Sequence, residues 1–328
     1  MTGLSDAAVA RLRSTAAWPE FDSPRYIVVE EIGRGGMGTV YRAFDDLLDR
    51  EVALKVPNGF GEASVARRLR VEAGVLARLE HPGIVPIHDA GSLADGRIFY
   101  VMKLVRGRTL REYLAGETPI DDRLGVFERI CEPVAFAHAR GFVHRDLKPD
   151  NVMLGPFGEV LIMDWGAAAS LAAAPGESDS PDAPDVPAVA AVAETASGII
   201  GTRGFMAPEQ AEGSSADTRA DVYALGAMLF LMLTGTLPGA GFPGNGVLPG
   251  ALRSICDRAT AGNAADRYPD VTSLAADVRR YRAGLAVAAH RETVVERTLR
   301  FARKYRTAIL LIAAYLVMRT IVAIMSGR

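Results

Sequence analysis

The sequence predicts an α+β protein with two lobes, in which a small β-rich lobe is followed by a larger α-rich lobe. Two patterns predict this. Segments rich in β-branched and aromatic residues, with short turns between them, dominate residues 25–105, and apolar residues at helical spacing dominate residues 106–282. The chain has 328 residues, enough for one large domain with appendages or for two ordinary domains. We therefore expect a well-buried core.

The β-rich part follows an N-terminal polar extension, residues 1–24, which is predicted to be a short helix and a linker. One helix is expected over 63–79, where apolar residues keep a helical period until a His-Pro-Gly sequence ends it. Strands are expected at 25–32, 39–44, 51–56, 84–89 and 98–104. Because short turns join the first three strands, we expect them to form an antiparallel meander.

The α-rich part shows helical spacing in five segments. Helices are expected at 110–115, 122–139, 217–234, 250–261 and 271–282, the second with aspartate caps in front of it. The very apolar run within 217–234 is too short to span a membrane and predicts a buried helix of the lobe. Residues 234–251 show no helical period.

Composition excludes several classes of function. The formal net charge is −2 and the isoelectric point is near 6.3, which argues against a nucleic-acid-binding protein. Two cysteines, Cys131 and Cys256, form neither a disulfide framework nor a zinc motif, and they suit a reducing cytoplasm. No secretory signal is predicted from the N-terminal sequence. The mean hydropathy of +0.13 is high for such a charged chain, so one segment is expected to carry concentrated apolar residues.

A glycine-rich motif connects the first two expected strands. Residues 33–38 match GxGxxG, a pattern that also occurs in plain turns and in dinucleotide-binding crossovers. A dinucleotide-binding crossover needs a helix directly after the glycines, whereas a strand is expected here. A hairpin whose glycines let backbone N–H groups approach phosphates fits better, and Val40 could cover an adenine ring. Lys55 lies in an apolar strand, where it either faces water at an edge or reaches phosphates with Glu72 as its partner. Glu62 and Glu80 are less suited as that partner, because they lie at the ends of the helix.

The sequence HRDLKPDN at 144–151 is the most specific motif in the chain. With it, residues 25–282 resemble the eukaryotic-type, or Hanks-type, bacterial Ser/Thr protein kinases. The resemblance implies a bilobal kinase domain with an N-lobe over 25–105 and a C-lobe over 106–282. It also implies that Asp146 accepts the proton of the substrate hydroxyl, that Lys148 stabilises the transferring phosphoryl group, and that Asn151 binds Mg²⁺.

The same resemblance assigns a nucleotide site. Asp164, in the triplet DWG, would be the second Mg²⁺ ligand, and Met102 would be the gatekeeper of a hinge in which Lys103 replaces a commoner acidic residue. The expected catalytic pair that holds the ATP phosphates is Lys55 with Glu72. The expected ATP-binding residues are Ile32, Gly33, Arg34, Gly35, Gly36, Met37, Gly38, Val40, Ala53, Lys55, Met102, Leu104 and Met153.

An activation segment is expected over 164–209, with a low-complexity acidic insert at 167–200 that predicts a mobile loop. By resemblance, Thr202 would bridge Asp146 and Lys148, Glu209 would pair with Arg267, and Asp221 would hold the catalytic loop. Trp165 stands where the family usually has Phe, and the docking helix that the family usually carries within 234–251 has no counterpart in the sequence. Arg145 next to Asp146 suggests activation by loop phosphorylation, with Thr195 or Ser197 as the autophosphorylation site.

The C-terminal region contains the concentrated apolar segment. Residues 307–325 are close to the length needed to cross a bilayer and are expected to form a transmembrane helix, although Arg319 interrupts them. A buried or oligomerisation helix and a surface-lying helix are the alternatives. Residues 283–306 form a basic juxtamembrane segment that could bind anionic lipids. The expectation is a single-pass protein of the cell membrane with a cytoplasmic kinase domain.

Together these observations predict an enzyme that transfers the γ-phosphoryl group of ATP, with Mg²⁺, to Ser/Thr hydroxyls of protein substrates. Nucleic-acid partners are not expected, membrane lipids are, and a homodimer remains open. The alternative is a membrane-attached pseudokinase or nucleotide-binding scaffold, suggested by Trp165 and the missing docking helix. A small-molecule phosphotransferase is less suited, because a long activation segment ending in Ala-Pro-Glu fits protein substrates.

Overall fold

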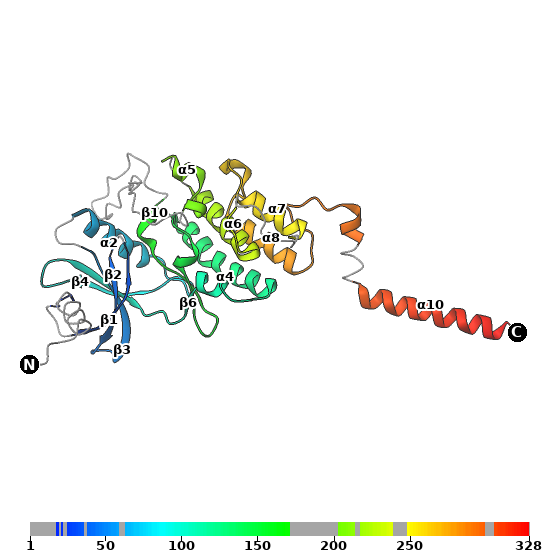
Figure 1. The fold of residues 1–328 in the computed structure, drawn as a ribbon, viewed down its shortest axis with the longest axis horizontal. Helices are drawn as coiled ribbons and strands as arrows, with labels where there is room; N and C mark the ends of the chain where they lie inside the picture. The colour runs from blue at the N-terminus through cyan, green and yellow to red at the C-terminus, as the bar shows by residue number, and fades with distance from the viewer. Residues whose placement is uncertain are drawn as a thin grey trace, which may run out of the picture.

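The chain forms two adjoining parts, one built on a β-sheet and one mainly helical (Figure 1). The computed structural model describes residues 18–19, 21, 25–35, 38–58, 63–170, 203–213, 217–238, 248–298 and 305–327. Within these ranges there is no cis peptide bond.

The N-terminal part is a five-stranded antiparallel sheet in the order β1-β2-β3-β5-β4. Its strands are β1 (Tyr26–Arg34), β2 (Thr39–Asp45), β3 (Arg50–Val56), β4 (Ile87–Ser92) and β5 (Ile98–Lys103). The predicted meander of the first three strands is confirmed. β4 begins later than expected, because Ile84 forms a parallel bridge with Ile162 of the other part instead of extending the sheet.

The two faces of this sheet are covered differently. Helix α2 (Ala63–Leu76) packs on the face that carries Ala53 and Met102. The opposite face, which includes Leu54, Phe99 and Val101, forms its own core cluster. Phe21 from the predicted polar extension packs on that cluster, with its ring centroid 5.0 Å from that of Phe99. Residues before the first strand therefore contribute to the core.

The C-terminal part is built around helices that surround α6 (Figure 1). The helices are α3 (Leu110–Leu114), α4 (Ile120–Ala139), α5 (Pro208–Ala211), α6 (Thr218–Thr234), α7 (Gly250–Ala259) and α8 (Val271–Arg282), with 3₁₀ turns η1 (Pro149–Asn151), η2 (Trp165–Ala167), η3 (Arg203–Phe205) and η4 (Ala264–Asp266). The N-cap of α4 is Pro119 and not the expected aspartate, since Asp121 lies inside the first turn. Most residues of α6 are buried, which confirms the prediction of a lobe helix.

Short strands hold the loops that face the first part. Strands β6 (Arg108–Thr109), β8 (Val152–Leu154) and β9 (Val160–Ile162) form a three-stranded sheet. β7 (Phe142–Val143) pairs with β10 (Ala169–Ser170). Because β7 and β8 flank residues 144–151, and β9 and β10 flank residues 163–168, these pairings place the two key loops at the junction of the two parts.

A long helix, α10 (Arg306–Ser326), lies apart from both lobes at the C-terminal end (Figure 1). The predicted helix is thus present. Among the residues that the structure describes, however, no helix has the combined length and apolarity that crossing a membrane requires. This finding corrects the transmembrane interpretation of 307–325.

Candidate active site

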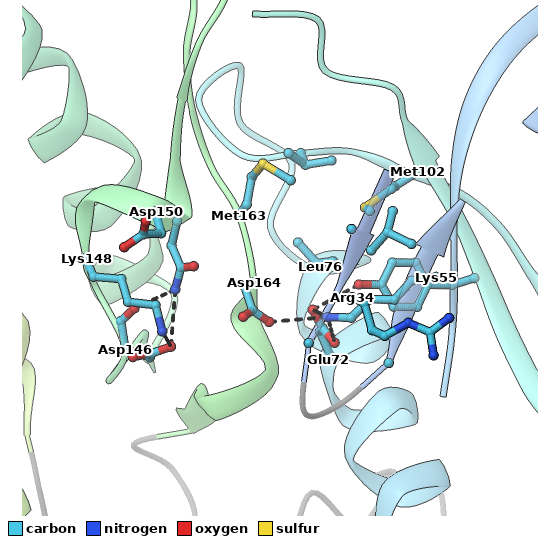
Figure 2. Close-up of a pocket in the computed structure, with 17 residues that line it drawn as sticks. Arg34, Lys55, Glu72, Leu76, Met102, Asp146, Lys148, Asp150, Met163 and Asp164 are labelled. Atoms are coloured by element: carbon cyan, nitrogen blue, oxygen red, sulfur yellow. Dashed lines mark hydrogen bonds and ion pairs between the residues drawn. The ribbon is translucent and has the colours of Figure 1, made fainter. Parts of the chain in front are cut away.

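A cavity of about 660 Å³ lies where the sheet meets the helical part. It is bounded by the β1–β2 turn, β3, α2 and the two loops of the C-terminal part (Figure 2). The residues that line it are Gly33, Arg34, Gly35, Gly38, Val40, Lys55, Glu72, Leu76, Val85, Tyr100, Met102, Asp146, Lys148, Asp150, Asn151, Met163 and Asp164. The fold therefore brings together motifs that are more than a hundred residues apart in sequence.

Lys55 is held by carboxylates on the sheet side of the cavity. Its Nζ lies 2.7 and 2.8 Å from the two carboxylate oxygens of Glu72 on α2, and 3.2 Å from Oδ1 of Asp164 (Figure 2). The hydroxyl of Tyr100 on β5 donates to Glu72 Oε1 at 2.9 Å. Lys55 is 7% and Glu72 1% exposed, so the pair is shielded from water. Glu72 is thus the partner of Lys55, and Glu80 lies exposed after α2.

Electrostatics favour the ionised forms of Lys55 and Asp164, whereas burial raises the pKa of Glu72 above its ordinary value despite the opposing charge of Lys55. Burial by itself would lower the pKa of Lys55, but the charges of Glu72 and Asp164 outweigh it and raise that pKa above its ordinary value. Burial would likewise raise the pKa of Asp164, yet Lys55 brings it below the usual range. A protonated lysine beside an ionised Asp164 is the arrangement that can bind phosphate oxygens and a divalent cation.

Residues 144–151 form the opposite wall. Lys148 Nζ donates to Asp146 Oδ2 at 2.7 Å, and Asn151 Nδ2 donates to the Asp146 carbonyl at 2.7 Å and to its Oδ2 at 3.2 Å. Pro149 starts the 3₁₀ turn η1, which places Asn151 back against Asp146. The carboxylate of Asp146 is therefore oriented by one cation and one amide (Figure 2).

Asp221 of α6 supports this loop from beneath. Its buried carboxylate accepts the backbone N–H groups of His144 and Arg145 at 2.8 and 2.9 Å, and it lies 2.7 Å from Nε2 of His138 on α4. Burial would raise the pKa of Asp221, but the His138 contact and the backbone donors lower it on balance. Arg145 adopts a left-handed backbone with φ of 68°. This strained conformation is stabilised by the bonds that Asp221 accepts.

The residues predicted to hold Mg²⁺ have a suitable donor set. Asp164 has a left-handed backbone with φ of 59°, and its side chain points into the cavity beside Lys55. Because Nδ2 of Asn151 is used toward Asp146, its amide oxygen is left as the group that can bind a cation. One carboxylate and one amide oxygen suit Mg²⁺, which usually completes its shell with phosphates and waters.

Trp165 follows Asp164 and is fully buried. Its ring centroid lies 4.6 Å from that of His144, and η2, which it begins, contacts α2. Among the described residues its Nε1 has no hydrogen-bond partner, which costs about 1–3 kcal/mol for a buried donor. The larger ring therefore fits the site of the expected Phe without using its polar group.

The segment that follows is tied to the C-terminal part. Arg267 donates to both carboxylate oxygens of Glu209 at 2.7 Å, and this contact lowers the pKa of Glu209. The neighbouring Gln210 donates from Nε2 to the carbonyl of Arg145 at 3.0 Å. These bonds connect the end of the activation segment with the loop that carries Asp146.

The glycine-rich turn and the inner end of the cavity accommodate some of the remaining predicted residues. A Cβ on Gly38 would come within 2.5 Å of the Val56 carbonyl oxygen, so only glycine allows this approach of the two strands. Val40 and Met102 line the cavity. Ala53 is buried opposite Met102 in the sheet. Ile32, Leu104 and Met153 are not among the residues that line the cavity.

Several predicted residues lie outside the described ranges, namely Gly36, Met37, Thr195, Ser197 and Thr202. Other contributors were missed by sequence reasoning. Tyr100, His138 and Gln210 bond to Glu72, Asp221 and Arg145 across 28, 83 and 65 positions of sequence. A polar aromatic residue within a buried strand is the one local signal that could have drawn attention to Tyr100.

Comparison with known proteins matches residues 26–278 to the protein kinase domain family. The chain is 34% identical over 292 residues to serine/threonine-protein kinase PknD of Chlamydia caviae and 35% identical over 293 residues to PknD of Chlamydia pneumoniae. PknD of Protochlamydia amoebophila is 33% identical over 298 residues.

Each match covers 79% of this chain, but the chain spans only about a third of the length of these relatives, 30–31%. The family match nevertheless covers most of the chain and includes every residue of the site described above. The chain therefore belongs to the protein kinase family, and within it to the Hanks-type bacterial Ser/Thr kinases.

Proposed function

We propose that this chain transfers the γ-phosphoryl group of ATP to Ser and Thr hydroxyls of protein substrates. The observation that carries the proposal is the pairing of two oriented clusters across one cavity. Lys55, Glu72 and Asp164 form one cluster, and Asp146 with Lys148 forms the other. Phosphoryl transfer depends mainly on positioning and charge neutralisation, which such clusters supply.

Each cluster has a role in this proposal. Lys55, kept protonated by its two carboxylate neighbours, binds the α- and β-phosphates near the glycine-rich turn. Asp146 orients the acceptor hydroxyl and takes its proton, and Lys148, 2.7 Å away, stabilises charge on the transferring group. Asn151 and Asp164 would hold Mg²⁺, which supplies charge neutralisation at the phosphate oxygens.

The rival function is that of a pseudokinase scaffold, which Trp165 and the lack of a helical period over 234–251 of the sequence suggest. The geometry favours the enzyme, because Lys55, Asp146, Asn151 and Asp164 all lie at the same cavity. Trp165 is accommodated in the core without displacing Asp164 from Lys55.

The test is transfer of radiolabel from [γ-³²P]ATP, with Mg²⁺, to a generic protein substrate and to the chain itself, followed by phosphoamino-acid analysis. Asp146→Asn should reduce transfer at least about 1,000-fold, because it removes the proton acceptor. Asp257→Asn makes the same chemical change on the exposed surface of α7 and should leave transfer unchanged. Equal transfer by the wild type and Asp146→Asn would refute the proposal, and label on Ser or Thr of the chain itself would establish autophosphorylation.

We also propose that the protein works at the cytoplasmic face of the cell membrane. Two features support this: the basic segment 283–306, and the exposed apolar side chains of α10, among them Leu311 at 67% and Ile312 at 59% exposure. Flotation with vesicles should show binding when anionic lipid is present and loss of binding when Arg291, Arg297 and Arg306 are changed to Gln. Equal binding to neutral vesicles by both proteins would contradict a role for the basic segment.

A further inference from the structure

Asn58, directly after β3, is hydrogen-bonded to both sides of the glycine-rich turn. Its Nδ2 donates to the carbonyl of Gly35 at 2.6 Å, and its Oδ1 accepts from the hydroxyl of Thr39 at 2.7 Å. Gly35 directly follows β1 at the start of the turn, and Thr39 begins β2 after it. We refer to these two bonds as the Asn58 bridge.

The surroundings hold this bridge in place. Thr39 is 3% exposed and pairs with Val56 in the sheet, so its hydroxyl has a defined position. Gly38 approaches Val56 so closely that a Cβ would meet the Val56 carbonyl oxygen at 2.5 Å. Pro57 follows Val56 with a restricted φ and presents Asn58 to the turn. The turn is closed further by a bond from Gly35 N to Gly38 O at 2.9 Å.

The geometry points to Asn58 as a positioning residue for the nucleotide. We infer that the Asn58 bridge holds Gly35, Gly38 and Thr39, the described residues of the glycine-rich turn, in position to bind phosphates before ATP arrives. Asn58 is not among the residues that line the cavity, so it acts through the turn and not on the reacting atoms. The inference rests on the proposed function, because it assigns the turn to ATP phosphates.

The combination of a donor and an acceptor in the amide is essential to this role. Asn58 must donate to one oxygen and accept from another, so an isosteric aspartate keeps the Thr39 bond and places a carboxylate against the Gly35 carbonyl. A residue that only fills space would tolerate that change. Asn58→Asp and Asn58→Ala should therefore both release the turn.

The kinetic effect follows from when the bridge acts. When the turn is less often in the binding conformation, ATP binds less tightly in the ground state and in the transition state by the same factor. The KM for ATP therefore rises and kcat stays unchanged. Losing the two partly exposed hydrogen bonds of the Asn58 bridge should weaken ATP binding enough to raise the KM for ATP about fivefold. Thr39→Val should have a smaller effect, and its combination with Asn58→Ala should be less than additive, because both changes break the same bridge.

The experiment combines ATP kinetics with hydrogen exchange of the full chain. In both Asn58 variants we expect the KM for ATP to rise about fivefold, kcat to stay within about twofold, and amides of 33–40 to exchange about fivefold faster without nucleotide. Asn263→Ala removes an asparagine that caps a turn of the C-terminal part and serves as the matched control, with wild-type values in both assays. Melting temperatures report on general destabilisation.

The two readouts separate the inference from the proposed function. If the wild type transfers no phosphate, the proposed function fails, and the exchange of 33–40 alone decides whether the Asn58 bridge orders the turn. Wild-type exchange and a wild-type KM in Asn58→Ala would overturn the inference. A fall in kcat with an unchanged KM would also overturn it. So would wild-type kinetics and exchange in the Asn58→Asp variant.

Discussion

Replacing Glu72 with Gln tests the central electrostatic feature of the site. The change keeps the size of the side chain and an oxygen for the Tyr100 hydroxyl, but it removes the charge that faces Lys55 at 2.7 and 2.8 Å. The pair is almost fully buried. Breaking a buried ion pair from one side costs about 3–5 kcal/mol, and here we expect about 3 kcal/mol because Asp164 remains 3.2 Å from Lys55.

The same change should reduce catalysis. Without Glu72, Lys55 pairs with Asp164 alone, which withdraws the lysine from phosphate and the carboxylate from Mg²⁺. We expect kcat/KM to fall about 100-fold, equivalent to about 2.7 kcal/mol, and the Mg²⁺ concentration needed for half-maximal rate to rise. Steady-state kinetics and urea unfolding at pH 7 measure the two effects separately.

Glu80→Gln is the matched control, because Glu80 is an exposed glutamate just beyond the same helix. It should change neither kcat/KM nor the free energy of unfolding by a measurable amount. The reasoning would be refuted if the kcat/KM of Glu72→Gln stayed within about threefold of the wild-type value. It would also be refuted if Glu80→Gln lost as much kcat/KM as Glu72→Gln.

Three further predictions concern the framework of the site. Because Arg267 lowers the pKa of Glu209, the stability from this pair is present above about pH 4.3 and is lost as pH falls through the folded-state pKa. The free energies of unfolding of Glu209→Gln and the wild type should therefore converge as the pH falls. A difference that stays constant with pH would contradict a stabilising ion pair between Glu209 and Arg267. Asp221→Asn places an amide NH₂ among three N–H donors and should lower the free energy of unfolding by about 3 kcal/mol, measured in urea; no loss would contradict its role. Trp165→Phe loses packing but also an unpartnered N–H, so unfolding should change by less than about 1.5 kcal/mol and phosphate transfer should persist; abolished transfer would favour a specific role for the indole.

Elements with a strong local pattern were predicted well. The helix expected at 271–282 is found with the same limits, because an aspartate caps its start and its apolar spacing is regular. The β-meander was predicted because short turns leave few other pairings. By contrast, Ile84 was assigned to a strand although it bridges to Ile162, since a local pattern does not show which distant segment a β-branched residue meets.

The site divides in the same way. Lys55 could be proposed from its strand and spacing, and Asp146, Asn151 and Asp164 from the family resemblance of their motifs; all four line the cavity. The sequence offered three glutamates as partners of Lys55, and the preference for Glu72 depended on its place within the helix. The contact of Glu72 with Lys55 exists because α2 packs on the sheet face that carries Ala53 and Met102.

At the two ends of the chain, the structure differs from the sequence-based expectations at particular residues. Phe21 was placed in a polar extension, yet it packs against Phe99 on the sheet. Residues 307–325 were expected to span a membrane, and their helix is found without the apolar length for it among the described residues. For Phe21 the composition of the segment did not show that one aromatic side chain would meet the sheet.

The sequence by itself determined the order of the elements, the family resemblance and the chemical groups available for phosphoryl transfer, because these depend on local spacing and residue type. Only the tertiary structure decided how those groups are held. The hydroxyl of Tyr100 on Glu72, the carboxylate of Asp221 beneath residues 144–145 and the amide of Asn58 across the glycine-rich turn join parts of the chain that local propensity does not connect. Such bonds form only after the core has packed, when burial makes an unpaired polar group costly and a matched pair favourable.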